Sequence, residues 1–132
     1  MLIKLNKRIM STKSELEYFV KTMMKGDDYR VQLVSERYGA YFICMIQTLN
    51  IKKETITSGL EIMSEEILAG EVKLSHVLVL IAFCIELDKN CKLKQYPWYS
   101  SGMLTEIIVN ILWRIEFVPP SSLYYFKICN II

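Results

Sequence analysis

Few residues of this sequence combine a type and a spacing that could support catalysis. His76 is the single histidine, so the chain offers at most one imidazole base. Glu65 and Glu66 are adjacent carboxylates, but neighbouring residues of a helix point about 100° apart and do not converge on one substrate. The sequence contains no glycine-rich phosphate loop and no nucleophile elbow. We therefore expect a binding protein and not an enzyme.

The four cysteines do not form a metal-binding pattern. No two of Cys44, Cys84, Cys91 and Cys129 have the Cys-x-x-Cys spacing, and no second histidine accompanies His76. A structural zinc site needs about four clustered ligands, so we expect no metal site and no cofactor. Cys44 and Cys84 lie within apolar periodic segments and are predicted to be buried, reduced thiols, which suits a cytosolic setting.

Charge and length exclude two further classes of protein. The chain has 132 residues, 16 of them basic and 14 acidic, and a net charge of +2. This balance predicts no nucleic-acid partner, because such proteins carry a strong basic excess on one face. The longest wholly apolar run, residues 77–85, is about half as long as a membrane span, so we expect no integral membrane segment. The whole chain, residues 1–132, is expected to form a single domain.

Apolar residues recur every three or four positions along most of the chain, which predicts an all-α fold. Thr12 and Glu15 have the spacing of a capping box, and Gly26 is a suitable end for the first helix. Asp27 or Asp28 caps the second helix. The expected helices cover residues 12–25, 28–50, 58–69, 72–87 and 101–118, with a charged linker at 89–97 and a last short helix at about 122–128.

Residues 77–85 are apolar on every side. A helix of this kind is usually the buried centre of a bundle. A buried strand is the rival interpretation, because valine and isoleucine are frequent in the segment, but its length and its helical flanks favour a helix.

Several of these segments together resemble the Bcl-2 (B-cell lymphoma 2) family. Arg37-Tyr38, followed by Phe42 and Met45, looks like the second helix of the pro-survival members, and Glu66-Ile67 resembles the helix that leads into the first homology region. Residues 77–83 are similar to the central helix of the family, and residues 12–19 to its fourth homology region. The resemblance implies a Bcl-2-like bundle of seven or eight helices around a buried central apolar helix.

The resemblance also implies a function. Pro-survival members inhibit apoptosis because they sequester the BH3 helix of a pro-apoptotic relative in a hydrophobic surface groove. The compact, divergent chain looks like a homologue from a large DNA virus, which implies the host-cell cytoplasm, with peripheral association at mitochondria as a further option. Carried over by position, the groove residues are Val34, Arg37, Tyr38, Tyr41, Phe42, Met45, Met63, Glu66, Ile67, Ser75, His76 and Phe83.

The sequence departs from the family at the mouth of this groove. His76 stands where the family has the arginine that pairs with the aspartate of the BH3 helix, and Ser75 replaces a glycine. Tyr41 occupies the place of a small residue. Because the charge-assisted contact is lost, we expect a narrow range of ligands, with Bim favoured by analogy with the family.

Two other functions stay open at this point. Some viral Bcl-2-like proteins antagonise immune signalling and bind no BH3 helix, and a groove narrowed by Tyr41 would suit that role. A purely structural, oligomeric helical bundle is the other alternative. The high apolar content, 52%, is also compatible with a homodimer.

Overall fold

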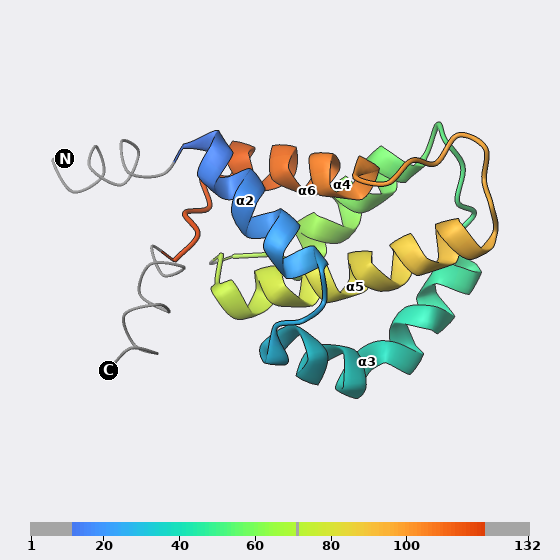
Figure 1. Ribbon diagram of the computed structural model, residues 1–132, viewed down its shortest axis with the longest axis horizontal. Coiled ribbons are helices and arrows are strands. Elements are labelled where there is room, and N and C mark those ends of the chain that lie inside the picture. Colours follow the sequence, from blue (N-terminus) through green and yellow to red (C-terminus); the bar gives the residue numbers. More distant parts are fainter. Residues whose placement is uncertain (1–11, 71, 121–132) are drawn as a thin grey trace, which may run out of the picture.

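The computed structural model describes residues 12–70 and 72–120, and this part of the chain contains helices and no strand (Figure 1). The all-α class predicted from the sequence is confirmed. Within the described residues there are five helices, fewer than the resemblance implies, and the short helix expected at about 122–128 lies outside them. The helices are α2 (Lys13–Met24), α3 (Tyr29–Thr48), α4 (Ile56–Ile67), α5 (Leu74–Leu93) and α6 (Met103–Arg114).

The first two helices begin where the sequence predicts. The hydroxyl of Thr12 accepts a hydrogen bond of 3.1 Å from the backbone N–H of Glu15, so Thr12 is the N-cap of α2. Asp28 is the N-cap of α3, and its carboxylate accepts from the N–H of Arg30 at 2.9 Å. Gly26 joins the two helices with a φ of +78°, a left-handed conformation that glycine adopts without a steric penalty.

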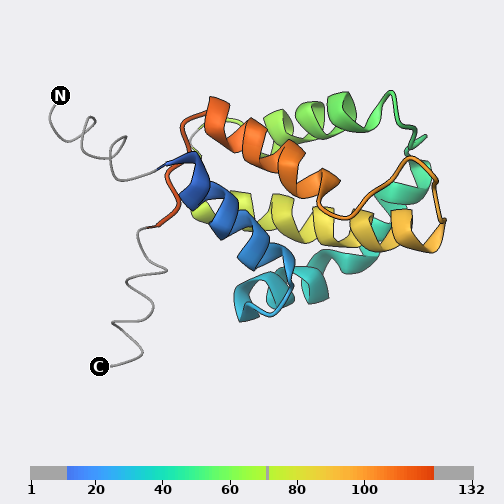
Figure 2. The same ribbon diagram turned by 45° about the horizontal axis from the view of Figure 1, so that its top comes forward.

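Helix α5 is the centre of the bundle, as the apolar run predicted. It packs against α2, α3, α4 and α6, and both ribbon views place it between α3 and α4 (Figures 1 and 2). In the run 77–85 the side chains are buried except for Val79 and Ile85, which are partly buried. Each fully buried large apolar side chain stabilises the fold by roughly 1.5–3 kcal/mol, so α5 is the main source of the core.

The predicted charged linker at 89–97 is wrong in its first half, because α5 continues to Leu93. Leu87 and Cys91 are buried and extend the apolar stripe by two further turns. The charged residues between them lie on the outer faces of the helix: Lys89 pairs with Glu86 at 3.5 Å, and Lys92 with Asp88 at 2.9 Å. Polar composition alone therefore did not mark the end of the helix.

Three other expectations also need correction. Helix α4 covers Ile56–Ile67, about two residues earlier than predicted, and α6 covers only Met103–Arg114. The chain leaves α6 through Glu116, which has a φ of +59°, and the N–H of Phe117 donates to the carbonyl of Leu112 at 3.0 Å. Cys44 is exposed and not buried, whereas Cys84 is buried as predicted.

Candidate functional site

The predicted groove residues follow three helices that share α5 as a common support. Helices α3 and α4 each pack against α5, and α5 lies between them in both views (Figure 2). The groove that the resemblance implies would therefore have α3 and α4 as its walls and α5 as its floor.

Aromatic rings connect the outer surface of α3 with the core. The ring of Tyr38, 43% exposed, lies 6.2 Å from that of Phe42. Phe42 meets Phe83 of α5 edge to face, with ring centroids 5.6 Å apart and planes at 86°. Phe42 and Phe83 are only 4% and 1% exposed. Both rings therefore belong to the hydrophobic core, and the packing of Phe42 on Phe83 holds α3 against α5.

A small apolar cavity lies at one end of this groove. Its volume is about 120 Å³, and its floor is Phe83 together with Leu87 of α5. The remaining lining comes from the end of α3, the connection to α4 and α4 itself, including Leu49, Ile51, Ile56, Leu60 and Met63. Ligand pockets for small molecules start at roughly 300 Å³, so this cavity suits a single apolar side chain better than a small molecule.

Two of the predicted residues, Met63 and Phe83, thus line the same cavity. Leu49 and Leu87 also line the cavity but were not among the predicted site residues. Helical spacing could have identified both, because Leu49 continues the apolar spacing of Phe42 and Met45, and Leu87 follows Phe83 by one helical turn.

The exposed wall of the groove is one side of α3. Val34, Tyr38, Tyr41 and Met45 recur every three or four residues and therefore share a face. Tyr41 is the most exposed of them, at 64%, whereas Val34 and Met45 are partly buried. Beside them the guanidinium of Arg37 lies 6.0 Å from the centre of the Tyr38 ring, a cation–π contact.

The opposite wall is α4, where Met63 and Ile67 are partly buried and pack against the core, and Glu66 is exposed. One helical turn separates Met63 from Ile67. Met63 and Ile67 therefore form a short apolar strip on α4, with the carboxylate of Glu66 beside it.

Ser75 and His76 lie in the first turn of α5, at the far end of the helix from the cavity. Ser75 is exposed, and His76 is partly buried with its Nδ1 atom enclosed and without a hydrogen-bond partner among the described residues. From His76 to Leu87 is eleven residues, about 16 Å along the helix. The twelve predicted residues are therefore distributed along α3, α4 and α5 and do not converge on one pocket.

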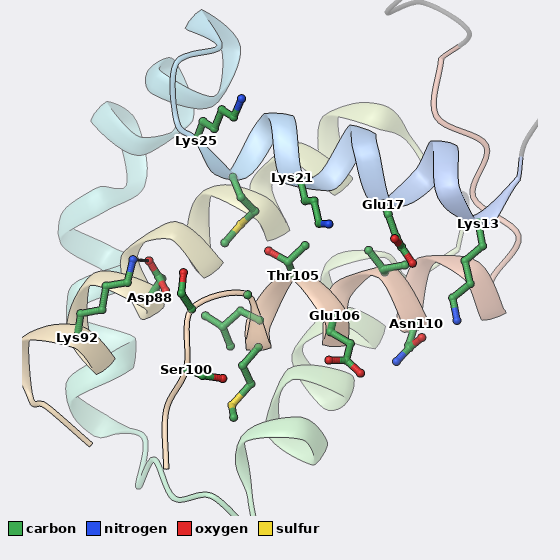
Figure 3. A pocket seen from close by; sticks show the side chains of 16 residues that line it. Lys13, Glu17, Lys21, Lys25, Asp88, Lys92, Ser100, Thr105, Glu106 and Asn110 are labelled. Carbon is green, nitrogen blue, oxygen red and sulfur yellow. Dashed lines mark ion pairs between the residues drawn. The ribbon is translucent and has the colours of Figure 1, made fainter. Parts of the chain in front are cut away.

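A larger, polar cavity of about 740 Å³ lies on the other side of α5, between α2, the end of α5 and the start of α6 (Figure 3). Its charged side chains have both signs, for example Lys21 and Glu17 on α2. At one edge the carboxylate of Asp88 pairs with Lys92 at 2.9 Å and accepts a hydrogen bond from the hydroxyl of Tyr99. Burial, followed by that hydrogen bond, raises the pKa of Tyr99 above its usual range.

A third cavity, of about 520 Å³, lies between α4 and α6, where Arg114 and Glu61 form an ion pair of 3.1 Å. None of the predicted groove residues lines either of the two larger cavities. Neither cavity has an arrangement of acid, base and nucleophile that we can assign to a reaction.

Comparison with known proteins gives no matching family model, no similar curated sequence and no similar solved structure. Among residues 12–70 and 72–120, no helix is long and apolar enough to cross a membrane. The same residues contain no group of three or more histidine, cysteine or acidic side chains arranged to hold a metal ion.

Proposed function

We propose that this protein inhibits apoptosis by sequestering the BH3 helix of a pro-apoptotic Bcl-2 protein in the groove between α3 and α4. The observation that carries the proposal is the small apolar cavity over Phe83, which lies between the end of α3, α4 and α5. The assignment to a Bcl-2-like fold, to a virus and to the host-cell cytoplasm belongs to the same proposal. The role is one of binding and involves no catalytic step.

The dimensions of the groove suit a helical ligand. The anchors of a BH3 helix at positions i to i+11 extend over about 16 Å, and the 20 residues of α5 rise by about 30 Å, so α5 is long enough to support all four anchors. One anchor fits the cavity beside Met63, and the others lie along Met45 and Ile67. Buried apolar anchors supply most of the free energy of binding in such a groove.

The mouth of the groove determines which ligands bind tightly. A histidine in place of an arginine removes a bidentate, charge-assisted contact with the ligand's aspartate. Two exposed cations, Arg37 of the predicted groove and Lys73 two residues before Ser75, offer weaker, solvent-screened alternatives. We therefore propose a narrow ligand range in which Bim is favoured.

Substitution of Met63 by glutamate tests the groove directly. The charge lies against the apolar cavity over Phe83, so calorimetry with a panel of BH3 peptides should give at least about tenfold weaker binding. Ile62→Glu is the matched control, because Ile62 is the neighbouring residue and is 60% exposed. Equal affinities for the two variants, both folded by circular dichroism, would contradict the groove assignment.

The second candidate function is antagonism of immune signalling without a BH3 ligand. The observation that favours it is Tyr41, whose side chain is 64% exposed on the wall of the groove. Tyr41→Ala distinguishes the two functions: in a BH3 binder the truncation changes the affinity for the peptide, whereas a protein that binds no BH3 helix gives no calorimetric signal with either form.

We also propose a homodimer through the outer face of α3. Leu33 is 57% exposed there, and Glu36 and Arg37 are exposed beside it. If two copies of α3 pair in antiparallel fashion about a two-fold axis between Glu36 and Arg37, each glutamate meets the other arginine, and Leu33 faces the small Ala40 of the second copy. Light scattering should give twice the monomer mass, and Leu33→Glu should give the monomer; a monomeric parent protein rules the dimer out.

A further inference from the structure

One end of the bundle differs from the rest in the side chains it exposes. It consists of the last turns of α5, the segment 94–102 and the connection 49–55 between α3 and α4. Both views place these segments at the same end (Figures 1 and 2). The small cavity confirms the proximity, since Leu49, Ile51 and Leu87 line it together. We call this region the lysine end.

Leu93 is the most exposed large hydrophobic side chain of the described residues, at 81%. It lies in the last turn of α5, one turn after Lys89, whose side chain is 68% exposed. Leu49 is exposed at the same end, at 42%. A single exposed leucine needs no explanation, but two at one tip form a surface that water solvates poorly.

Three aromatic rings follow directly in the segment after α5. Tyr96 and Trp98 stack with centroids 5.1 Å apart and planes at 11°, and Trp98 meets Tyr99 edge to face at 6.0 Å. All three are partly buried, and the hydroxyl of Tyr99 donates to Asp88 on α5. The rings are therefore held in place and keep part of their surface free. Tryptophan and tyrosine favour the boundary between lipid headgroups and hydrocarbon.

Within the described part of the chain, this end carries a net positive charge. Residues 49–55 and 86–102 include five lysines, namely Lys52, Lys53, Lys89, Lys92 and Lys94, and three acidic residues, namely Glu54, Glu86 and Asp88. Their net charge is +2, whereas the other described residues include seven basic and ten acidic residues and have a net charge of −3. Glu86 and Asp88 each pair with a lysine.

We infer that the lysine end docks on an anionic membrane surface. Leu93 and the free edges of Tyr96 and Trp98 enter the headgroup boundary. Lys52, Lys53 and Lys94, which form no ion pair with another described residue, approach lipid phosphates. A positive surface attracts anionic lipids with roughly a fivefold gain in binding for each lysine, and the gain weakens with salt. The proposed contact is peripheral, made by side chains at the membrane surface.

This inference goes beyond the proposed function, because it concerns a contact with lipid and not with a peptide. The two regions adjoin: Leu49, Ile51 and Leu87 line the small cavity and also belong to the lysine end, whereas Leu93 and Lys94 do not line the cavity. Failure of the peptide experiments would leave membrane docking intact, and failure of membrane docking would leave the groove intact.

Co-sedimentation with vesicles tests the inference on the full chain. Vesicles of phosphatidylcholine mixed with phosphatidylserine are compared with vesicles of phosphatidylcholine alone, at low and at high salt. We expect binding to the mixed vesicles that salt reverses. No sedimentation with the mixed vesicles at low salt, or equal sedimentation with both kinds, would overturn the inference.

Paired variants locate the contact on the molecule. Leu93→Glu should lower binding to the mixed vesicles at least about tenfold, because it removes the apolar insertion and adds a negative charge. Ile62→Glu has the same chemistry on a side chain that is 60% exposed in α4, and should have a smaller effect. Both positions are exposed, so neither variant is expected to unfold the protein.

The lysines have a control at the other end of the same helix. Lys53→Gln with Lys94→Gln should weaken binding by roughly 25-fold, about fivefold for each charge. Lys73→Gln removes a charge from an exposed side chain at the start of α5 and should have little effect. Equal losses for the control and the lysine-end variants would contradict docking through this end.

Fluorescence gives an independent measurement. In a Trp113→Phe variant, Trp98 is the only remaining tryptophan, and its emission should shift to shorter wavelength on the mixed vesicles, because the ring leaves water. An unchanged spectrum on vesicles that do sediment the protein would show that another surface makes the contact.

Discussion

Helices α2 and α3 lie next to each other in the chain and have opposite relations to the core. Helix α2 packs against both α5 and α6, and its apolar stripe, Leu16, Phe19, Val20 and Met23, is at most 4% exposed. Helix α3 is longer but packs mainly on α5. It buries only Val31, Phe42 and Ile46 and leaves four tyrosine or leucine side chains more than 40% exposed, namely Tyr29, Leu33, Tyr38 and Tyr41.

The difference shows which helix has apolar surface left for a partner. The apolar side chains of α2 are buried against neighbouring helices and stabilise the fold. Exposed aromatic side chains, as on α3, are typical of a binding surface. The contrast predicts that substitutions in α2 affect folding and that those on the exposed side of α3 affect binding.

The largest expected effect is on stability. Phe19→Ala should lower the free energy of unfolding by about 3–5 kcal/mol, because Phe19 is 2% exposed and its ring lies 5.9 Å from that of Phe117. Tyr41→Ala on α3 should change it by less than about 0.5 kcal/mol. Urea unfolding at neutral pH measures both, and similar losses for the two variants would remove the distinction between the helices.

Cysteine reactivity tests the difference between the exposed side of α3 and the buried side of α5. Cys44 is exposed on α3, whereas Cys91 is buried on α5, where burial raises its pKa from 9.0 to about 11. That shift alone lowers the thiolate fraction at neutral pH on the order of a hundredfold. In a Cys129→Ser background, a thiol reagent should label one cysteine rapidly, and Cys44→Ser should abolish that fast phase. Rapid labelling of a second thiol in folded protein would show that α5 is less enclosed than its burial indicates.

The sequence predicted which segments form helices better than it predicted where those helices end. Apolar residues at every third or fourth position and the caps Thr12 and Asp28 predicted α2 and α3 correctly, because those signals are local. The end of α5 was missed because Lys89 and Lys92 lie on exposed faces, and only the buried Leu87 and Cys91 show that the helix continues. Burial depends on neighbouring helices, which the sequence alone does not place.

The candidate groove shows the same limit. A resemblance assigns residues to a groove by their sequence position and gives no information on their burial. Phe42 and Met63 were therefore both predicted as groove residues. In the structure Met63 lines the cavity, whereas Phe42 is 4% exposed and packs edge to face on Phe83. Phe42→Ala therefore removes core packing as well as a groove residue, and a loss of binding in that variant does not by itself locate the ligand.

The smallest expected effect concerns the turn that joins α2 to α3. The hydrogen bond from the Arg30 side chain lowers the pKa of Asp28, and the N–H of Arg30 donates to the same carboxylate. A carboxylate with a lowered pKa in the folded state contributes stability above its unfolded pKa, and this contribution is lost as the pH falls through the folded value.

Asp28→Ala should therefore cost about 1 kcal/mol at neutral pH, the typical value of an N-cap, and Asp28→Asn should cost less, because asparagine still caps the helix. The difference between the parent protein and Asp28→Asn should shrink below the model-peptide pKa of 3.8 and vanish at lower pH. Urea unfolding from neutral to acidic pH measures it. A difference that persists at the lowest pH would mean that capping geometry, and not the ion pair with Arg30, makes Asp28 the better residue at the start of α3.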